Sequence, residues 1–214
     1  MPRWSRRPSS MPPENANMDE SLTGSPAAYR ELGEVLPLTV DSTTLRVVEG
    51  LRVVHLRYLE HGVRSVESAL LHQNLQALPQ PDTCAGPDPW QIWINPTESL
   101  VLTSQSAVAD RLLHALQPGR DILACALDQS AGCLVLELTG RHVDGVLTRL
   151  MEASANPQIG GQSTRVRFMD ISATLIRIDP NRVFLAVDRP QGLYAFQWIA
   201  YVLESVTEPH MSRL

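Results

Sequence analysis

The sequence predicts an α+β fold with mixed or antiparallel strands and three or four helices. Strand-like stretches, in which apolar residues recur at every second position, are interleaved with stretches that have the three-to-four-residue repeat of helices. Several strands pair across short turns, without the strict strand–helix–strand order of a doubly wound sheet. Hydrophobic residues make up 43% and charged residues 19% of the 214 positions, which is sufficient for a real core.

The first half of the chain predicts two strand pairs with a helix between them. Residues 44–58 alternate in hydrophobicity and predict a hairpin or two short strands. Residues 66–78 carry apolar residues on one side of a helix that prolines then stop. Residues 90–103 predict strand, turn and strand, with Asn95 and Pro96 at the turn.

The second half begins with an amphipathic helix and continues with alternating strands and helices. Its expected elements are a helix at 106–116, a buried strand at 122–126, a strand at 133–138, a helix at 142–151, an alternating stretch at 164–178 and a returning strand at 183–187. Asp179, Pro180 and Asn181 form a clear turn before the last strand. No internal repeat is evident in the sequence.

The last helix is predicted to begin at Pro190, because proline suits a first helical position. Between Leu193 and Leu203 only Gln197 interrupts the apolar residues. A helix that is apolar all round is buried on more than one side. We expect either a helix central to its own domain or a helix with a partner on its second face. The residues expected at such a subunit interface are Tyr194, Trp198, Tyr201 and Val202.

Composition along the chain suggests its domain organisation. Residues 1–26 are rich in Pro, Ser, Asn and Arg and are expected to be a disordered tail. Residues 27–206 are expected to form one α+β domain, and residues 207–214 a C-terminal tail. Two small lobes, at 27–104 and 105–206, are the alternative arrangement.

Several partners and chemistries are disfavoured by composition. A net charge of −5 at pH 7 argues against a broad nucleic-acid surface. All 18 basic residues are arginine, which excludes P-loop and Schiff-base chemistry because both require lysine. No apolar run approaches the ~18 residues of a membrane span, so no membrane partner is expected. Three cysteines without metal-binding spacing indicate buried thiols and fit a reducing cytoplasm.

A search for catalytic motifs finds none of the common signatures. GxGxxG, HExxH and GxSxG are all missing from the sequence, so no catalytic, cofactor-binding or metal-binding residue is predicted. Asp128 and Ser130 precede Cys133, but a polar pair before a strand is more typical of a turn. Arg141 stands at a helix start, where an anion could bind, although a surface arginine at a turn is the simpler interpretation.

Several stretches together resemble one known family. The features that carry the likeness are WINPTESLVL at Trp93–Leu102, similar to a W-L-G-P-D-E-W-L pattern, a D-x-S step at Asp128–Ser130, a strand followed by glycine at Cys133–Gly140, and a final helix bearing Tyr194 and Trp198. On these residues the chain resembles the gamma subunit family of heterotetrameric sarcosine oxidase, over positions 44–204. Gln129 departs from the family, which has an aliphatic residue there.

The resemblance implies a fold, partners and a role. The fold would be a reduced form of the folate-binding domain of glycine-cleavage aminomethyltransferases. The chain would be a non-catalytic accessory subunit that binds no cofactor, beside large subunits of an amine-oxidising complex that carry FAD, FMN, NAD and tetrahydrofolate. That complex would oxidatively demethylate sarcosine and pass the one-carbon unit to tetrahydrofolate.

Two alternative functions remain open from the sequence. One is a stand-alone folate-binding or aminomethyltransferase-like protein, for which Asp128 or Asp170 would be the acidic residue facing the pocket. The other is a small regulatory module that binds an anionic ligand near Arg141.

Overall fold

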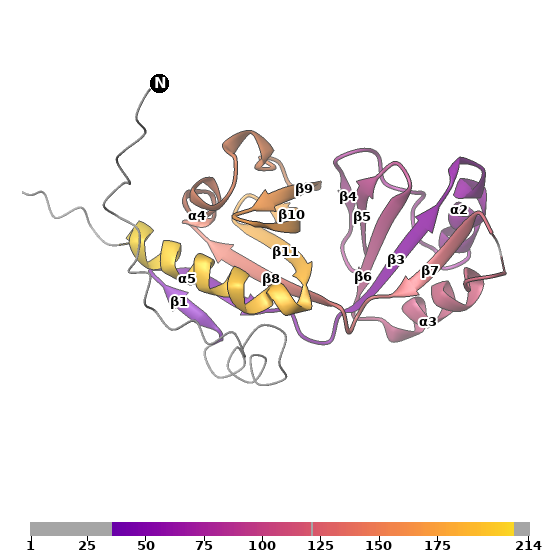
Figure 1. Cartoon of the computed structure of the whole chain (residues 1–214), viewed down its shortest axis with the longest axis horizontal. Helices are drawn as coiled ribbons and strands as arrows, with labels where there is room; N and C mark the ends of the chain where they lie inside the picture. Colours follow the sequence, from indigo (N-terminus) through magenta and orange to yellow (C-terminus); the bar gives the residue numbers. More distant parts are fainter. Residues whose placement is uncertain (1–35, 121, 208–214) are drawn as a thin grey trace, which may run out of the picture.

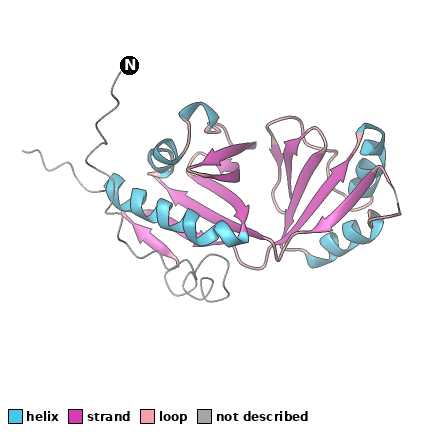
Figure 2. Cartoon of the chain, viewed as in Figure 1, coloured by secondary structure: helices cyan, strands magenta, loops and turns pink. Residues whose placement is uncertain are grey.

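The chain folds into four layers, with two antiparallel sheets inside and helices on both outer faces (Figure 1, Figure 2). A computed structural model describes residues 36–120 and 122–207. The tails predicted at 1–26 and 207–214 lie outside the described residues, apart from Thr207. Strands and helices are mixed without regular βαβ repetition, so the predicted α+β class is confirmed.

The larger sheet, called sheet A, has six strands in the order β1-β2-β8-β11-β10-β9, and all neighbours are antiparallel. Its strands are β1 (Leu38–Val40), β2 (Thr43–Val47), β8 (Cys133–Gly140), β9 (Gln162–Phe168), β10 (Ile171–Asp179) and β11 (Arg182–Asp188). The N-terminal strand β2 therefore pairs with β8 from the second half of the chain, and β1 extends the sheet beyond β2.

The smaller sheet, called sheet B, has five strands in the order β4-β5-β6-β3-β7. Its strands are β3 (Arg52–Tyr58), β4 (Cys84–Ala85), β5 (Trp90–Asn95), β6 (Glu98–Thr103) and β7 (Ala124–Asp128). An isolated bridge between Thr83 and Gln162 joins its β4 side to β9 of sheet A.

Helices cover the outer face of each sheet. Helices α2 (Val63–Leu71) and α3 (Ser106–Ala115) lie on sheet B, and α4 (Val143–Leu150) and α5 (Gly192–Thr207) lie on sheet A. Short 3-10 turns precede or follow them: η2 (Glu60–Gly62), η3 (Ala153–Ala155) and η4 (Arg189–Gln191). Alternation along the strands sends every second side chain to the helices and the others to the opposite sheet.

The two halves of the molecule repeat one topology. The first runs β3-α2-β4-β5-β6-α3-β7, and the second runs β8-α4-β9-β10-β11-α5. The sheet order β4-β5-β6-β3-β7 then corresponds to β9-β10-β11-β8-β2, with β2 from the start of the chain in the place of β7. Strand β1 is an additional edge strand without a counterpart in sheet B. This structural repeat has no evident repeat in the sequence.

Strand register shows which residues are equivalent. Val53 O accepts a hydrogen bond from Gln129 N at 2.8 Å, and Val135 O accepts one from Val48 N at 2.9 Å, at matching points of the two crossovers. The cross-strand pairs Val53–Leu102, between β3 and β6, and Val135–Ala186, between β8 and β11, are likewise equivalent. The equivalent positions in the core between the sheets are Val53 and Val135, Ile92 and Ile176, Ile94 and Ile178, Leu100 and Phe184, and Leu102 and Ala186.

The hairpin turns of the two halves are also alike. Thr97 N donates to Asn95 Oδ1, and Asn181 N donates to Asp179 Oδ1, both at 2.9 Å. A short polar side chain that accepts the amide two residues ahead makes an Asx-turn, and the proline that follows it restricts the backbone. The turns predicted at both places are therefore confirmed, with a register shift in each hairpin.

Three local predictions required correction. Of the two forms expected for residues 44–58, the two short strands are observed and the hairpin is not, because β2 and β3 belong to different sheets and are joined by a crossover. The helix expected at 66–78 spans Val63–Leu71 and is followed by Asn74 in a left-handed conformation, with φ of 56°. The strand expected at 122–126 lies at 124–128, and Ile122 is 91% exposed.

The points where the chain crosses between the sheets can be compared with the alternative of two lobes, at 27–104 and 105–206. The chain passes from sheet A to sheet B at 48–51 and returns at 129–132. The elements before and after residue 104, β6 and α3, lie in the same half and contact the same core. Each half is thus defined by a sheet and its helices, and the half with sheet A is built from two separated segments.

Candidate functional site

Helix α5 presents one face to sheet A and another to solvent. Proline at its entry, in η4, starts the turn that leads into it. Ala195, Ile199, Val202 and Leu203 are between 0% and 6% exposed and belong to the core over sheet A. Val202 was expected at a subunit interface, but its side chain lies in the core of this chain. The spacing of buried residues is that of one helical face.

An aromatic row occupies the outer side of α5 and consists of Tyr194, Trp198 and Tyr201. The rings of Tyr194 and Trp198 are 6.3 Å apart at 68°, and those of Trp198 and Tyr201 are 6.1 Å apart at 89°. Both contacts have the edge-to-face geometry that aromatic pairs prefer. Tyr201 is 65% exposed, whereas Trp198 is half-buried against the core. A row of large, partly exposed rings is typical of an interaction surface.

Asp128, a candidate acidic residue, lies at the end of β7 and stabilises a crossover. Its Oδ1 accepts hydrogen bonds from Ser130 N at 2.9 Å and Ser130 Oγ at 2.5 Å, and its Oδ2 pairs with Arg52 Nη2 at 2.8 Å. Arg52 also reaches Asp110 of α3 at 3.1 Å. The Ser130 hydrogen bond, followed by Arg52, holds the pKa of Asp128 below its usual range. Asp128 is therefore an ionised structural carboxylate.

The other charged candidates are on the surface with partners in this chain. Asp170 is 77% exposed in the turn after β9 and pairs with Arg167 at 3.1 Å. Arg141 pairs with Asp41, whose Oδ2 is also 3.0 Å from His142 Nε2. The hydrogen bond from His142, followed by that from Arg141, lowers the pKa of Asp41. Asp41 thus already occupies the position that an anionic ligand of Arg141 would take.

Cys84 and Cys133 do not provide a nucleophile. Burial raises the pKa of Cys133 to about 11, with Asp188 adding to the effect, and burial alone raises the pKa of Cys84 to about 11. Both side chains are therefore thiols at neutral pH. Within residues 36–120 and 122–207, no three His, Cys, Asp or Glu side chains gather as metal ligands would.

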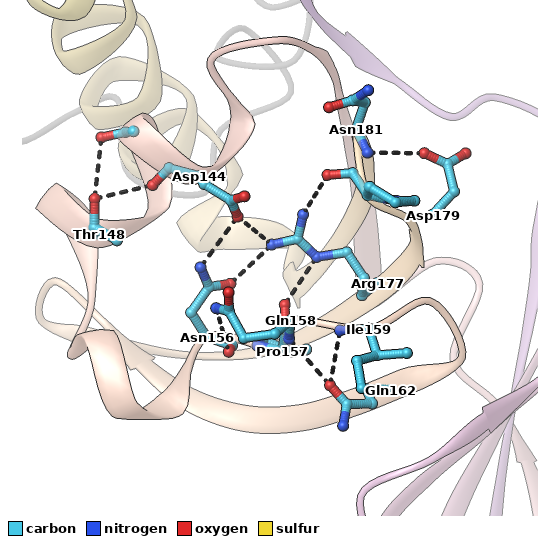
Figure 3. Close-up of polar contacts among 12 residues, drawn as sticks. Asp144, Thr148, Asn156, Pro157, Gln158, Ile159, Gln162, Arg177, Asp179 and Asn181 are labelled. Atoms are coloured by element: carbon cyan, nitrogen blue, oxygen red, sulfur yellow. Dashed lines mark hydrogen bonds and ion pairs between the residues drawn. The ribbon is translucent and has the colours of Figure 1, made fainter.

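A buried arginine that sequence reasoning missed anchors the long loop after α4 (Figure 3). Arg177, on β10, is 1% exposed. Its Nε donates to Pro157 O at 2.9 Å, its Nη1 to Pro180 O at 2.8 Å, and its Nη2 to Asn156 Oδ1 at 3.0 Å and Asp144 Oδ1 at 2.5 Å. The guanidinium is satisfied by groups of this chain, so its role is structural. A single arginine inside an apolar strand was the available signal.

None of the helices in the described part of the chain is both long and apolar enough to cross a membrane.

Comparison with known proteins identifies the fold. No protein-family model matches the chain, and no curated protein sequence matches it. Among solved structures, it resembles a chain of the heterotetrameric sarcosine oxidase from Corynebacterium sp. U-96, which was solved in complex with pyrrole 2-carboxylate. The TM-score is 0.71 at 21% identity, covering 88% of this chain and 98% of that chain.

A second solved structure shares the fold over part of its length. The chain matches the glycine cleavage system aminomethyltransferase T from Bartonella henselae with a TM-score of 0.55 at 13% identity. The match covers 80% of this chain but 48% of the aminomethyltransferase, so the chain spans about half the length of that protein. These likenesses confirm, at the level of fold, the resemblance that the sequence indicated. The chain has the fold of a whole sarcosine oxidase chain and of part of an aminomethyltransferase.

Proposed function

We propose that this chain is a non-catalytic, gamma-like accessory subunit of a heterotetrameric, sarcosine-oxidase-type complex. The observation that carries the proposal is the extent of the structural match, which covers 98% of a chain from such an oxidase. The larger partner subunits carry FAD, FMN, NAD and tetrahydrofolate, demethylate sarcosine oxidatively and transfer the one-carbon unit to tetrahydrofolate. The assembly works in the cytoplasm.

The chemistry of the described residues supports a role without catalysis. Asp128, Asp170 and Arg141 each have a partner in this chain, and the thiols of Cys84 and Cys133 are protonated at neutral pH. Nucleophilic catalysis needs a lowered pKa or an adjacent base. The contribution of this chain to the complex is accordingly binding and support.

The aromatic row of α5 is the surface through which the chain docks onto a larger subunit. Aromatic residues are enriched at interfaces, and a few such anchors carry most of the binding energy. Tyr194, Trp198 and Tyr201 meet this description because their rings are in edge-to-face contact and none of the three is buried.

The test is co-expression of the full chain, tagged at its N-terminus, with the amine-oxidising large subunits of its own source. A flavin-coloured complex is expected on the tag, and the double variant Tyr194→Ser/Tyr201→Ser should bind it about 10- to 100-fold more weakly. Leu71→Ser, at a side chain 61% exposed on the opposite outer layer, is the matched control and should leave binding unchanged. Recovery of the chain alone, soluble and colourless, would contradict the proposal.

A stand-alone folate-binding or aminomethyltransferase-like protein is the second candidate, supported by the fold shared with an aminomethyltransferase. It predicts tetrahydrofolate binding by the isolated chain in a calorimetric titration. A heat of binding would favour this function, and the lack of any heat would exclude it.

A further inference from the structure

Two cavities open into the layer between the sheets, at equivalent places in the two halves. The first cleft, of about 190 Å³, is lined by residues of β3, β5 and β6 and by β9, β10 and β11. The second, of about 520 Å³, lies beside β4 and the opposite ends of β10 and β11. Glu98 lines the first and Arg182 lines the second, and these residues are equivalent by strand register.

The buried carboxylate beside the second cavity has both of its charge partners within this chain. Glu137 is 1% exposed, and its two carboxylate oxygens pair with Arg46 and Arg182. Arg182 also lies over the ring of Phe184, 5.3 Å from its centroid. A buried carboxylate between two arginines is a satisfied arrangement. Glu137 therefore leaves no oxygen unpaired that a ligand in the second cavity would have to satisfy.

The equivalent position in the first half holds His55, and it is not satisfied. The register pairs His55 with Leu100 and Glu137 with Phe184, which makes His55 the counterpart of Glu137. Its Nε2 is buried and makes no hydrogen bond to the described residues, with Glu98 Oε2 3.7 Å away. A buried polar atom without a partner is costly and commonly indicates a missing ligand or water.

The charges around His55 leave one cation available. Glu98 is engaged by Arg57 Nε at 3.2 Å and by Asn95 Nδ2 at 2.9 Å. Arg165 lines the same cleft and donates its Nε to Ser172 Oγ at 3.1 Å, while within the described chain its terminal nitrogens have no carboxylate partner. Burial lowers the pKa of His55, opposed by Glu98 and aided by Arg57 and Arg165, so the imidazole is neutral at pH 7.

We propose that the first cleft binds a small carboxylate, held by the guanidinium of Arg165 and by a hydrogen bond from His55 Nε2. A guanidinium offers the paired donors that match a carboxylate, and a neutral imidazole protonated at Nε2 supplies a third. The volume is far above the ~10–15 Å³ that one water requires, so it accommodates a group of several atoms. Val53, Ile94 and Leu100 form an apolar floor that suits a short hydrocarbon part.

The cleft contains both a cation, Arg165, and an anion, Asp188, so binding of a carboxylate can be tested against binding of an ammonium group. Asp188 also lines it, beside Cys133, and could favour a ligand with an ammonium group. Acetate, glycine and methylammonium therefore separate the two chemistries. The carboxylate site requires that acetate binds and that methylammonium does not compete with it. Glycine binds as acetate does, because it carries the same carboxylate.

The experiment is a chemical-shift titration of the full chain, with labelled histidine, at constant ionic strength. Acetate should shift the imidazole resonances of His55 in the roughly 0.1–100 mM range open to ligands of a few atoms. Arg165→Gln and His55→Gln should each weaken binding at least about tenfold. Arg167→Gln is the matched control, two residues along β9 and with its charge directed to Asp170. It should change the affinity less than about twofold.

Three outcomes would overturn the proposal. They are no shift of His55 across the titration, equal weakening by Arg167→Gln and Arg165→Gln, and competition by methylammonium. Arg165 is exposed, so its variant should fold as the parent does, and the test does not depend on His55→Gln remaining folded. The titration uses the chain without large subunits, so its result is independent of the accessory-subunit proposal.

Discussion

The two halves of the molecule share a topology and an inter-sheet core but differ in how they treat interior charge. The half with sheet A holds Glu137 between Arg46 and Arg182, and it anchors its α4–β9 loop with Arg177. The half with sheet B has His55 at the position of Glu137, and it anchors its α2–β4 loop with the neutral amide of Gln91. The equivalent apolar positions between the sheets stay apolar in both halves, whereas the polar positions differ: His55 stands where the other half has Glu137, and Glu98 where it has Arg182.

This comparison separates structural from functional positions in a molecule without a catalytic motif. Apolar residues at equivalent places in the core satisfy the same packing requirement in both halves. A buried ionic group must be fully paired or it destabilises the fold. The half with sheet A meets this requirement internally, whereas in the half with sheet B the buried His55 Nε2 makes no hydrogen bond to the described residues. The difference directs attention to the first cleft.

The largest expected effect tests the loop anchors. Arg177→Met should lower the free energy of unfolding by about 3–5 kcal/mol, because it leaves the carbonyls of Pro157 and Pro180 and the side chain of Asn156 without a buried donor. Gln91→Met removes two neutral hydrogen bonds, to Gln76 N and O, and should cost about 1–3 kcal/mol. Urea unfolding of both variants measures the difference. Equal losses would show that the charge of Arg177 has no special role.

An intermediate effect tests the equivalence of the core positions. Ile92 and Ile176 are both 0% exposed, at equivalent places on β5 and β10. Each change to alanine removes the same buried atoms and should cost about 2–5 kcal/mol, with similar values for the two variants. Thermal unfolding followed by circular dichroism measures this. A large difference would mean that one half relaxes around the cavity and the other does not.

The smallest effect concerns the crossover between β7 and β8. The pKa of Asp128 is lowered in the folded chain, so its ionised form stabilises the fold above the unfolded pKa of about 3.9. That contribution is lost as pH falls through the lower, folded pKa. Asp128→Asn should therefore lower the melting temperature slightly at pH 7 and lessen its fall between about pH 5 and pH 2. Parallel melting curves that stay equally separated at all pH values would contradict this linkage.

Local features were the most predictable from the sequence. The turns at Asn95 and Asp179 followed from side chains that accept their own backbone amides, and alternation identified the strands on either side. The end of α2 was placed too late because its apolar spacing continues after the backbone has left the helix. Periodicity reports which side chains face a core, and residues after a helix can face the same core.

The candidate site was only partly predictable. Tyr194, Trp198 and Tyr201 were expected at an interface because the helix is apolar all round, and in the structure their rings lie on one side of α5, as residues three and four apart do. Their role at an interface stays a prediction. Val202 was grouped with them because an apolar helix does not show which face its own sheet covers. His55 and Arg165 could not be predicted as a pair, since residues on β3 and β9 become neighbours only when the two sheets pack together.

The sequence by itself determined the α+β class, most of the strands and helices, and the chemistries that a chain without lysine cannot perform. These properties depend on local periodicity, turn chemistry and composition. Only the tertiary structure decided that β2 pairs with β8, so that Arg46 meets Glu137 across 91 positions, and that two halves without an evident sequence repeat share one topology. Strands that are far apart in the sequence pair because their apolar faces can be buried against the same core. Many arrangements of apolar residues satisfy that burial, so the sequence pattern alone does not identify the partner strand.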